Sequence, residues 1–314
     1  MLGLNGFIKT VMMSLNSLQQ IYQKKQWFFA VVCFVVILSS CSSGRSVENR
    51  ILHADNIVLG SKLAPESIKT PYFSLHSAYS FYESGGLLTI YIEGDGRSWV
   101  SRYQLSNNPT PINPVALNLA IIHAEKNPNS NIAWLARPCQ YQLTKGDVNC
   151  ESKYWSSHRF SEQVIQSTNN AIDQLVKKSD ASKVRLIGFS GGAAVAVLVA
   201  ARRDDVDSIV SIAGNLDHQQ VNTHHGVTPL RGSFNPMDVV EKISSVPQLH
   251  FIGALDKVIP VEISTDFISA QKNTCAQQVI VPDAEHIDGW LDYWHKALIN
   301  LNEKLSCDKL SVTF

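Results

Sequence analysis

The chain lacks an excess of charge of either sign. It carries 27 basic and 27 acidic residues among 314, so its formal net charge is zero. Proteins that bind nucleic acids need a strongly basic face to neutralise phosphates, and this composition does not indicate one. The composition is otherwise that of a globular protein. We therefore expect no nucleic-acid partner.

The sequence also lacks the motifs that hold metal ions or nucleotide phosphates. None of the cysteines beyond residue 41 has a neighbouring cysteine at the close spacing of a zinc site. The glycine-rich segment 93–96 is not followed by the Gly-Lys-Ser/Thr sequence that a phosphate-binding loop requires. We therefore expect neither a metal nor an organic cofactor.

A comfortable membrane span is missing as well. The apolar run at residues 27–38 has 12 residues. As a helix it would span about 18 Å, against about 30 Å of bilayer hydrocarbon. It follows Lys24 and Lys25, and residues 1–40 contain no acidic residue. Because a basic segment before a short apolar run is typical of secretory signals, we predict a signal peptide at residues 1–40.

Cys41 directly follows this signal, in the sequence Leu38-Ser39-Ser40-Cys41. The motif resembles the lipobox of bacterial lipoproteins, in which cleavage leaves the cysteine as a lipid-carrying N-terminus. Several acyl chains anchor a protein stably to a membrane. Ser42 resembles a signal for the outer membrane, so the resemblance implies a lipid-anchored protein of the bacterial cell envelope that faces the periplasm. An ordinary cleaved signal with an incidental cysteine, or an uncleaved anchor, is the alternative.

Four cysteines lie beyond the predicted signal and lipidation site. An even number in an exported domain indicates two disulfides, although four cysteines permit three pairings. We favour Cys139–Cys150 and Cys275–Cys307, because each pair brackets one local excursion of the chain.

From about residue 63 onwards, short apolar runs that suit strands alternate with longer runs that suit helices. This alternation is typical of an α/β domain with a mostly parallel sheet flanked by helices. We place the domain at residues 63–314, after a polar tether at 41–62. Residues 214–238 are rich in His, Gly and Pro and lack periodicity, so we interpret them as a small lid. Strands are expected at 72–75, 87–92, 132–136, 184–187, 207–213, 247–253 and 278–281, and helices at 114–126, 158–178, 193–200, 261–270 and 289–304.

The sequence Gly188-Phe189-Ser190-Gly191-Gly192 joins the expected strand at 184–187 to the Ala-rich run at 193–200. A serine on a sharp turn from strand to helix needs small neighbours, because its backbone is strained and its hydroxyl must stand clear. This context is that of a nucleophile elbow. The alternative is a glycine-rich turn without chemistry.

Two later strand ends carry residues that could serve such a serine. Asp256 follows the expected strand that ends at Gly253, and His286 follows the expected strand at 278–281. A nucleophilic serine needs a base, and the base needs an acid to orient it. Because the carboxyl ends of parallel strands meet at one edge, we predict Ser190 as nucleophile, His286 as base and Asp256 as the orienting acid. An ordinary turn residue is the alternative for Asp256.

Other residues compete for these roles. Asp283 and Asp288 lie too close to His286 in sequence to hold it from another strand end. The lid histidines could line a pocket, but we expect them to be solvated loop residues. The rival histidines are His123, His218, His224 and His225.

The three motifs, in the order Ser, Asp, His, resemble the α/β-hydrolase superfamily over roughly residues 70–304. The resemblance implies an oxyanion hole made of two backbone N–H groups. One would be that of Gly191, and the other that of Asp95 in the loop after the strand at 87–92. Glu93 stands where many family members have histidine. A plain turn is the alternative reading of this loop.

The resemblance implies an envelope-anchored serine hydrolase that cleaves carboxylic esters, of lipids or of small molecules, by acyl transfer. A peptidase or amidase with the same three residues is an alternative, although the small lid favours an esterase. A lipoprotein that keeps the fold but only binds its partner is a third possibility, against which the intact residue set argues. The fold does not fix the substrate.

Overall fold

The computed structural model describes residues 46–143, 149–272, 275–305 and 307. The predicted signal peptide at 1–40 and the predicted lipidation site Cys41 lie outside these residues. The chain divides into two compact units, residues 1–49 and 50–314, and the fold described below is that of the second. Within the described ranges, no helix combines the length and apolar character that crossing a membrane would require.

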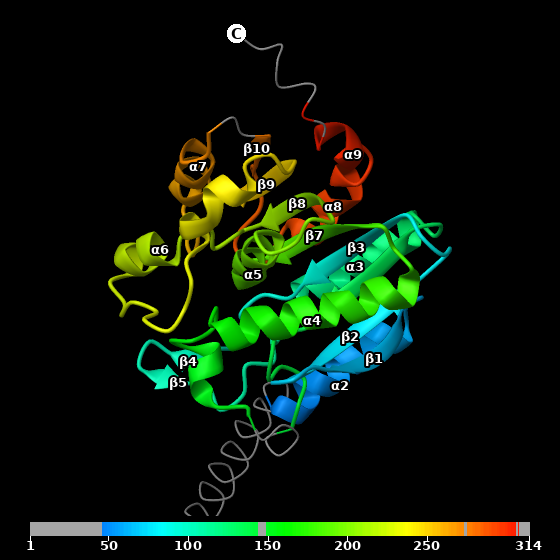
Figure 1. The fold of residues 1–314 in the computed structure, drawn as a ribbon. Helices are drawn as coiled ribbons and strands as arrows, with labels where there is room; N and C mark the ends of the chain where they lie inside the picture. The colour runs from blue at the N-terminus through cyan, green and yellow to red at the C-terminus, as the bar shows by residue number, and fades with distance from the viewer. Residues whose placement is uncertain (1–45, 144–148, 273–274, 306, 308–314) are drawn as a thin grey trace, which may run out of the picture. The chain divides into compact units, whose positions relative to one another are not determined.

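An eight-stranded sheet forms the centre of this unit, in the order β1-β2-β6-β3-β7-β8-β9-β10 (Figure 1). The pairs β1–β2 and β2–β6 are antiparallel, whereas every pair from β6 to β10 is parallel, so the predicted mostly parallel sheet is confirmed. The strands of the sheet are β1 (Ala64–Lys69), β2 (Ser74–Ser80), β3 (Leu87–Ile92), β6 (Asn131–Leu135), β7 (Lys183–Phe189), β8 (Val206–Ile212), β9 (Gln248–Gly253) and β10 (Ala276–Val281). A small hairpin of β4 (Trp99–Ser101) and β5 (Gln104–Leu105) follows β3.

Helices cover both faces of the sheet, because each face presents a separate apolar core. One core joins the sheet to α4 (Glu162–Ser179) and α5 (Gly191–Ala200), and every residue of α5 is buried. The other joins the sheet to α3 (Val115–Lys126) and α8 (Trp290–Ala297), which pack against each other. The remaining helical segments are α2 (Val47–Leu59), α6 (His218–His225), α7 (Val261–Ser269), α9 (Leu301–Lys304) and the short 3₁₀ turns η2 (Ser152–Trp155) and η3 (Pro236–Ile243).

The segment expected as a polar tether at 41–62 contains a helix instead. In α2, Ala54 and Val58 lie one turn apart and are buried in the second core. The Arg50 side chain is also buried, and it donates to the carbonyl oxygens of Thr110 and Asn108. Val47, Ile51, Ala54 and Val58 recur at helical spacing, so the sequence did contain a signal for this helix.

The segment interpreted as a lid, 214–238, also contains regular structure. Asp217 caps α6 by accepting hydrogen bonds from the backbone N–H groups of Gln219 and Gln220, at 2.9 and 3.2 Å. Gly226, with a φ of 60°, ends the helix in the left-handed conformation. Two good caps therefore define an eight-residue helix whose polar sequence has no apolar stripe.

The single helix expected at 289–304 is divided. Asn300 leaves the helical conformation, with a φ of −119°, and separates α8 from α9. Nothing in the sequence of this region marks the break, since it contains neither proline nor glycine after residue 289.

Two disulfides close the excursions that the sequence suggested. Cys139 is bonded to Cys150, and Cys275 to Cys307. Their Cα atoms are 5.5 and 5.2 Å apart, within the usual range for a disulfide. These are the two pairings that we favoured from the sequence.

Candidate active site

Ser190 occupies a strained turn between β7 and α5. Its φ is 51° and its ψ is −120°, a conformation that residues with a side chain rarely adopt. The turn is possible because its neighbours lack side chains. A Cβ atom on Gly188 would lie 2.4 Å from the Cα atom of Ala193, and one on Gly192 would lie 2.3 Å from the carbonyl oxygen of Ile92. The strand, turn and helix therefore have the geometry of a nucleophile elbow.

The structure brings the three predicted side chains together at the carboxyl edge of the sheet. Ser190 Oγ lies 3.0 Å from His286 Nε2, and His286 Nδ1 lies 2.9 Å from Asp256 Oδ2. The Asp256 carboxylate accepts the hydrogen from Nδ1, because an ionised carboxylate can only accept. Nε2 of a neutral His286 is then the acceptor for the Ser190 hydroxyl hydrogen. The arrangement can remove a proton from Ser190.

Backbone contacts hold the acid and the base in place. The side chain of Asp256 is fully buried, and its Oδ1 accepts from the N–H groups of Val258 and Ile259 at 2.7 and 2.9 Å. Trp290 Nε1 donates to the carbonyl oxygen of His286 at 3.0 Å. A Cβ atom on Gly253 would lie 2.4 Å from the carbonyl oxygen of Ala284, so glycine allows the two loops to touch.

The loop after β3 lies against the start of α5. A Cβ atom on Gly191 would lie 2.1 Å from Asp95 Oδ1, which shows how closely the two segments approach. Among the described residues, neither the Gly191 nor the Asp95 backbone N–H has a hydrogen-bond acceptor. The N-terminus of α5 also carries a partial positive charge. Both predicted donors are therefore available to bind a negatively charged oxygen.

A buried arginine and a partly buried one hold the Asp95 side chain, and the sequence analysis missed both. Arg137 and Arg159 contact the carboxylate at 3.2 and 2.7 Å. Burial by itself would raise the pKa of Asp95, but the charges of Arg159 and Arg137 outweigh it and hold that pKa below its ordinary value. Arg137 directly follows the strand predicted at 132–136. A charged side chain at that strand end was the one signal in the sequence that could have identified Arg137 as part of the site.

Glu93 takes over a supporting role beneath the same loop. Its buried carboxylate accepts hydrogen bonds from the N–H groups of Gly94, Ala116 and Leu117, and from Trp134 Nε1, at 3.0 to 3.4 Å. Burial raises the pKa of Glu93, and these four donors offset part of that rise. Glu93 therefore ties the loop to the start of α3, which explains how the fold accommodates its departure from histidine.

The rival histidines lie elsewhere. His218 is buried against the ring of Phe160, so the expectation of a solvated loop residue is wrong for it. The capped helix α6 turns that side chain inward. His224 is exposed, and His225 Nε2 contacts the carbonyl oxygen of Val258 at 2.8 Å. Of the histidines in the described ranges, His286 is the one hydrogen bonded to Ser190.

Metal-ligating groups were sought in the same part of the chain. The described residues contain no cluster of three or more His, Cys, Asp or Glu side chains that could hold a metal ion. The polar groups around Ser190 are instead those of a proton relay and of backbone donors.

A family model described as Serine hydrolase (FSH1) matches residues 113–287, which is more than half of the chain and includes Ser190, Asp256 and His286. No curated protein matches the chain.

Several solved structures share the fold at low sequence identity. The esterase PF2001 from Pyrococcus furiosus is 13% identical, with a TM-score of 0.57 over 79% of this chain and 91% of that one. Est1E from Butyrivibrio proteoclasticus is 15% identical, with a TM-score of 0.53 over 77% and 98%. ATU1826, a putative α/β hydrolase from Agrobacterium tumefaciens, is 14% identical, with a TM-score of 0.53 over 77% and 98%. These similarities establish the α/β-hydrolase fold.

Proposed function

The chain belongs to the Serine hydrolase (FSH1) family, and on that premise we propose that it hydrolyses carboxylic esters with Ser190 as nucleophile, His286 as general base and Asp256 as the orienting acid. The observation that carries the proposal is the continuous hydrogen-bond chain Ser190–His286–Asp256, at 3.0 and 2.9 Å. It lies beside two backbone N–H groups that have no acceptor among the described residues.

In the first half of the reaction, Ser190 Oγ attacks the ester carbonyl carbon while its hydrogen moves to His286 Nε2. The tetrahedral intermediate collapses, the bond to the alcohol oxygen breaks, and His286 returns the proton to that oxygen. The products of this half are an acyl-serine and a free alcohol. Asp256 stabilises the imidazolium that forms between the two proton transfers.

The negative oxygen of the intermediate would be bound by the N–H groups of Gly191 and Asp95. Each such donor contributes about 10²- to 10³-fold to the rate in other serine hydrolases. Arg137 and Arg159 act indirectly, because they hold the Asp95 side chain and so position the loop that carries the Asp95 N–H. They are positioning residues in this proposal.

In the second half, water attacks the acyl-serine. His286 Nε2 takes a proton from the water, the acyl–Oγ bond breaks, and the proton passes to Ser190 Oγ. The products are a carboxylic acid and the regenerated enzyme. The chemistry requires no group beyond the side chains and N–H donors named above.

Two observations favour esters over peptides as substrates. The lid segment 214–238 holds only α6 and the start of η3, so it is much smaller than the large caps that peptidases of this fold often carry. One of the structural neighbours, PF2001, is named as an esterase. The alkoxide of an ester also leaves more readily than the nitrogen of an amide, so ester cleavage is the easier reaction for the same three residues.

We further propose that the enzyme is a lipoprotein anchored through Cys41 to the bacterial cell envelope, on the periplasmic side of the outer membrane. The lipobox-like sequence and the acid-free segment 1–40 support this proposal. The two disulfides support it as well, since such bonds persist in oxidising compartments. Labelling of cells with a fatty-acid probe should mark the wild type and leave Cys41→Ser unmarked. Equal labelling of both would contradict the proposed anchor.

The catalytic proposal is tested by labelling the folded, signal-free enzyme with a fluorophosphonate. Wild type should be labelled and Ser190→Ala should not. A series of nitrophenyl esters of increasing acyl length, run beside the matching anilides, then separates ester from amide hydrolysis. We expect turnover of esters with the anilides slower by orders of magnitude.

Each other outcome has a definite meaning. Comparable rates on anilides would favour a peptidase or amidase with the same residues. A folded wild type that is neither labelled nor active on any ester would favour a binding protein that only retains the fold.

A further inference from the structure

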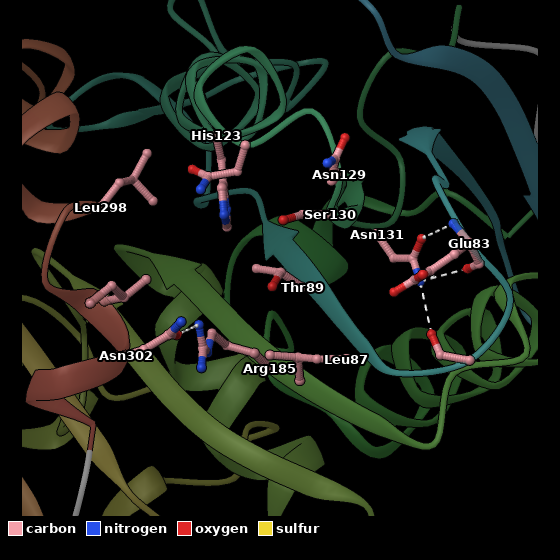
Figure 2. Close-up of a pocket in the computed structure, with 13 residues that line it drawn as sticks. Glu83, Leu87, Thr89, His123, Asn129, Ser130, Asn131, Arg185, Leu298 and Asn302 are labelled. Atoms are coloured by element: carbon pink, nitrogen blue, oxygen red, sulfur yellow. Dashed lines mark hydrogen bonds between the residues drawn. The ribbon is translucent and has the colours of Figure 1, made fainter.

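A polar cavity lies at the edge of the sheet opposite the candidate active site, where β3 and β7 begin (Figure 2). Its volume is about 240 Å³, which is several times that of one water molecule. Thr89 of β3, Arg185 of β7, His123 of α3 and Asn302 of α9 are among the residues that line it. The active site occupies the carboxyl ends of the same two strands, so the two sites are separate.

A relay of hydrogen bonds fixes the state of His123. The indole Nε1–H of Trp294 can only donate, and it lies 3.1 Å from Tyr91 Oη. Tyr91 Oη lies 2.8 Å from His123 Nδ1. Because the Tyr91 oxygen already accepts from Trp294, we assign the hydroxyl hydrogen to this contact, with Nδ1 as the acceptor. Burial, together with the nearby charge of Arg185, lowers the pKa of His123 to about 4. The ring is therefore neutral at pH 7 and carries its hydrogen on Nε2.

That Nε2–H points into the cavity without a partner. His123 is only 7% exposed, and the sole hydrogen bond of its ring among the described residues is the one with Tyr91. Figure 2 shows the ring directed toward the space between Thr89 and Arg185. The Nε2–H group is therefore a donor that faces the cavity and can bind an acceptor placed there.

Two further donors face the same space. Thr89 is 3% exposed, and its hydroxyl has no hydrogen-bond partner in the described part of the chain. The Arg185 guanidinium is held by Ser208, Asn302 and Asp207 at 2.8, 2.8 and 3.2 Å. These three bonds use three of its five N–H groups. Asp207 is 40% exposed on its side chain, so it offsets the charge of Arg185 only in part.

We propose that this cavity binds a small oxyanion, the carboxylate or phosphate group of a small molecule, between His123 Nε2–H, the Thr89 hydroxyl and the Arg185 guanidinium. Hydrogen bonds to a charged acceptor are about twice as strong as neutral ones, so three convergent donors favour an anion over a neutral ligand. The one carboxylate that lines the cavity, that of Glu83, lies at the far end beside Asn131, as Figure 2 shows. The proposal does not depend on the proposed ester hydrolysis.

The test is a titration of the folded, signal-free protein with inorganic phosphate and, separately, with acetate. Chloride keeps the ionic strength constant. Two-bond ¹H–¹⁵N spectra of histidine-labelled protein report the His123 ring, and the free spectrum should show the Nε2–H form. We expect a saturable shift of the His123 signals with at least one ion. Saturation by phosphate alone identifies a phosphate site, and saturation by acetate alone identifies a carboxylate site.

Two variants and one control make the result specific. Thr89→Val keeps the shape of the side chain and suits a strand, but it removes the hydroxyl, and we expect about tenfold weaker binding. Tyr91→Phe removes the donor to Nδ1, so the fixed Nε2–H form should be lost and binding should weaken. Ser190→Ala, at the other edge, should bind like the wild type. No saturable shift with either ion, or equal binding by wild type and Thr89→Val, would overturn the proposal.

Discussion

The polar groups at the two edges of the sheet differ in whether they have hydrogen-bond partners. At the carboxyl edge, each side chain of the proposed relay has a partner, so that Ser190, His286 and Asp256 form one closed chain of hydrogen bonds. At the amino edge, Thr89 and the Nε2–H of His123 have no acceptor among the described residues. The first arrangement is complete without a ligand and can move a proton, whereas the second leaves two polar groups free to bind one.

Both edges are connected by the same two strands. β3 carries Thr89 in its first half and leads into the Asp95 loop, and β7 carries Arg185 near its start and leads into Ser190. The difference between the edges therefore does not come from different scaffolds. Loops after the strands build the carboxyl edge, while residues within strands and helices build the amino edge.

Ser190→Ala is expected to have the largest effect, because it should abolish hydrolysis at the carboxyl edge and leave anion binding at the amino edge unchanged. Removing the nucleophile should lower kcat/KM on a reactive ester by about 10⁶-fold, as in other serine hydrolases. Binding of phosphate or acetate near His123 should not change. Steady-state rates together with the ion titration measure both effects on one preparation, and retained activity above about one hundredth of wild type would contradict the assigned nucleophile.

A smaller loss is expected from Asp256→Asn. The amide can donate to His286 Nδ1, so the ring would carry its hydrogen on Nε2 and could no longer accept from Ser190. We expect kcat to fall by about 10⁴-fold with a modest change in KM. Asp283→Asn in the neighbouring loop is the matched control and should be nearly silent. Equal losses in the two variants would remove the reason for choosing Asp256.

Gly191→Ala tests the contact between the elbow and the Asp95 loop. The new Cβ atom would lie 2.1 Å from Asp95 Oδ1, so the carboxylate and its two arginines must shift. Displacing one oxyanion donor should lower kcat by about 10²- to 10³-fold. Binding of a trifluoromethyl ketone, which forms a tetrahedral adduct, should weaken in parallel, while KM should change little. A loss confined to KM would indicate that the loop binds substrate and not the oxyanion.

Much of the carboxyl edge was predictable because its residues stand in short loops with distinctive neighbours. Glycines on both sides of Ser190, and the positions of Asp256 and His286 directly after predicted strands, are visible in the sequence. The Arg137–Asp95–Arg159 cluster was not, since its members lie 42 and 64 residues apart and share no motif. Only the folded sheet shows that they meet.

The residues of the amino edge could not be predicted from the sequence, for a different reason. Thr89, Tyr91 and Arg185 occur inside apolar runs, where a polar residue has no local signal of its function. His123 could be identified as a candidate base but not as the end of a relay from Trp294. The capped helix α6 was missed because its polar sequence has no clear apolar period, whereas α2 does contain apolar residues at helical spacing.

The smallest expected effect is a change of folding stability with pH, and it comes from two buried histidines. Burial lowers the pKa of His250 to about 3 and that of His123 to about 4, both from an ordinary value of 6.5. Between pH 6.5 and 4, the unfolded chain binds protons at these positions and the folded chain does not, so stability must fall as the pH falls. Each histidine should contribute a slope of about 1.4 kcal/mol per pH unit.

Urea unfolding of wild type and His123→Gln at several pH values measures this slope. The variant should lose less stability on acidification, by about 1.4 kcal/mol per pH unit, and the two proteins should run parallel above pH 8, where neither histidine state changes. The raised pKa of Glu93 acts in the opposite direction just above pH 4.5, but it is common to both proteins and cancels in the difference. Phosphate should raise the stability of the wild type at pH 7 more than that of the variant, because an anion that binds the folded site stabilises the fold. Parallel curves from pH 4 to 8 would show that folding does not lower the pKa of His123, which would contradict the burial of a neutral ring at the amino edge.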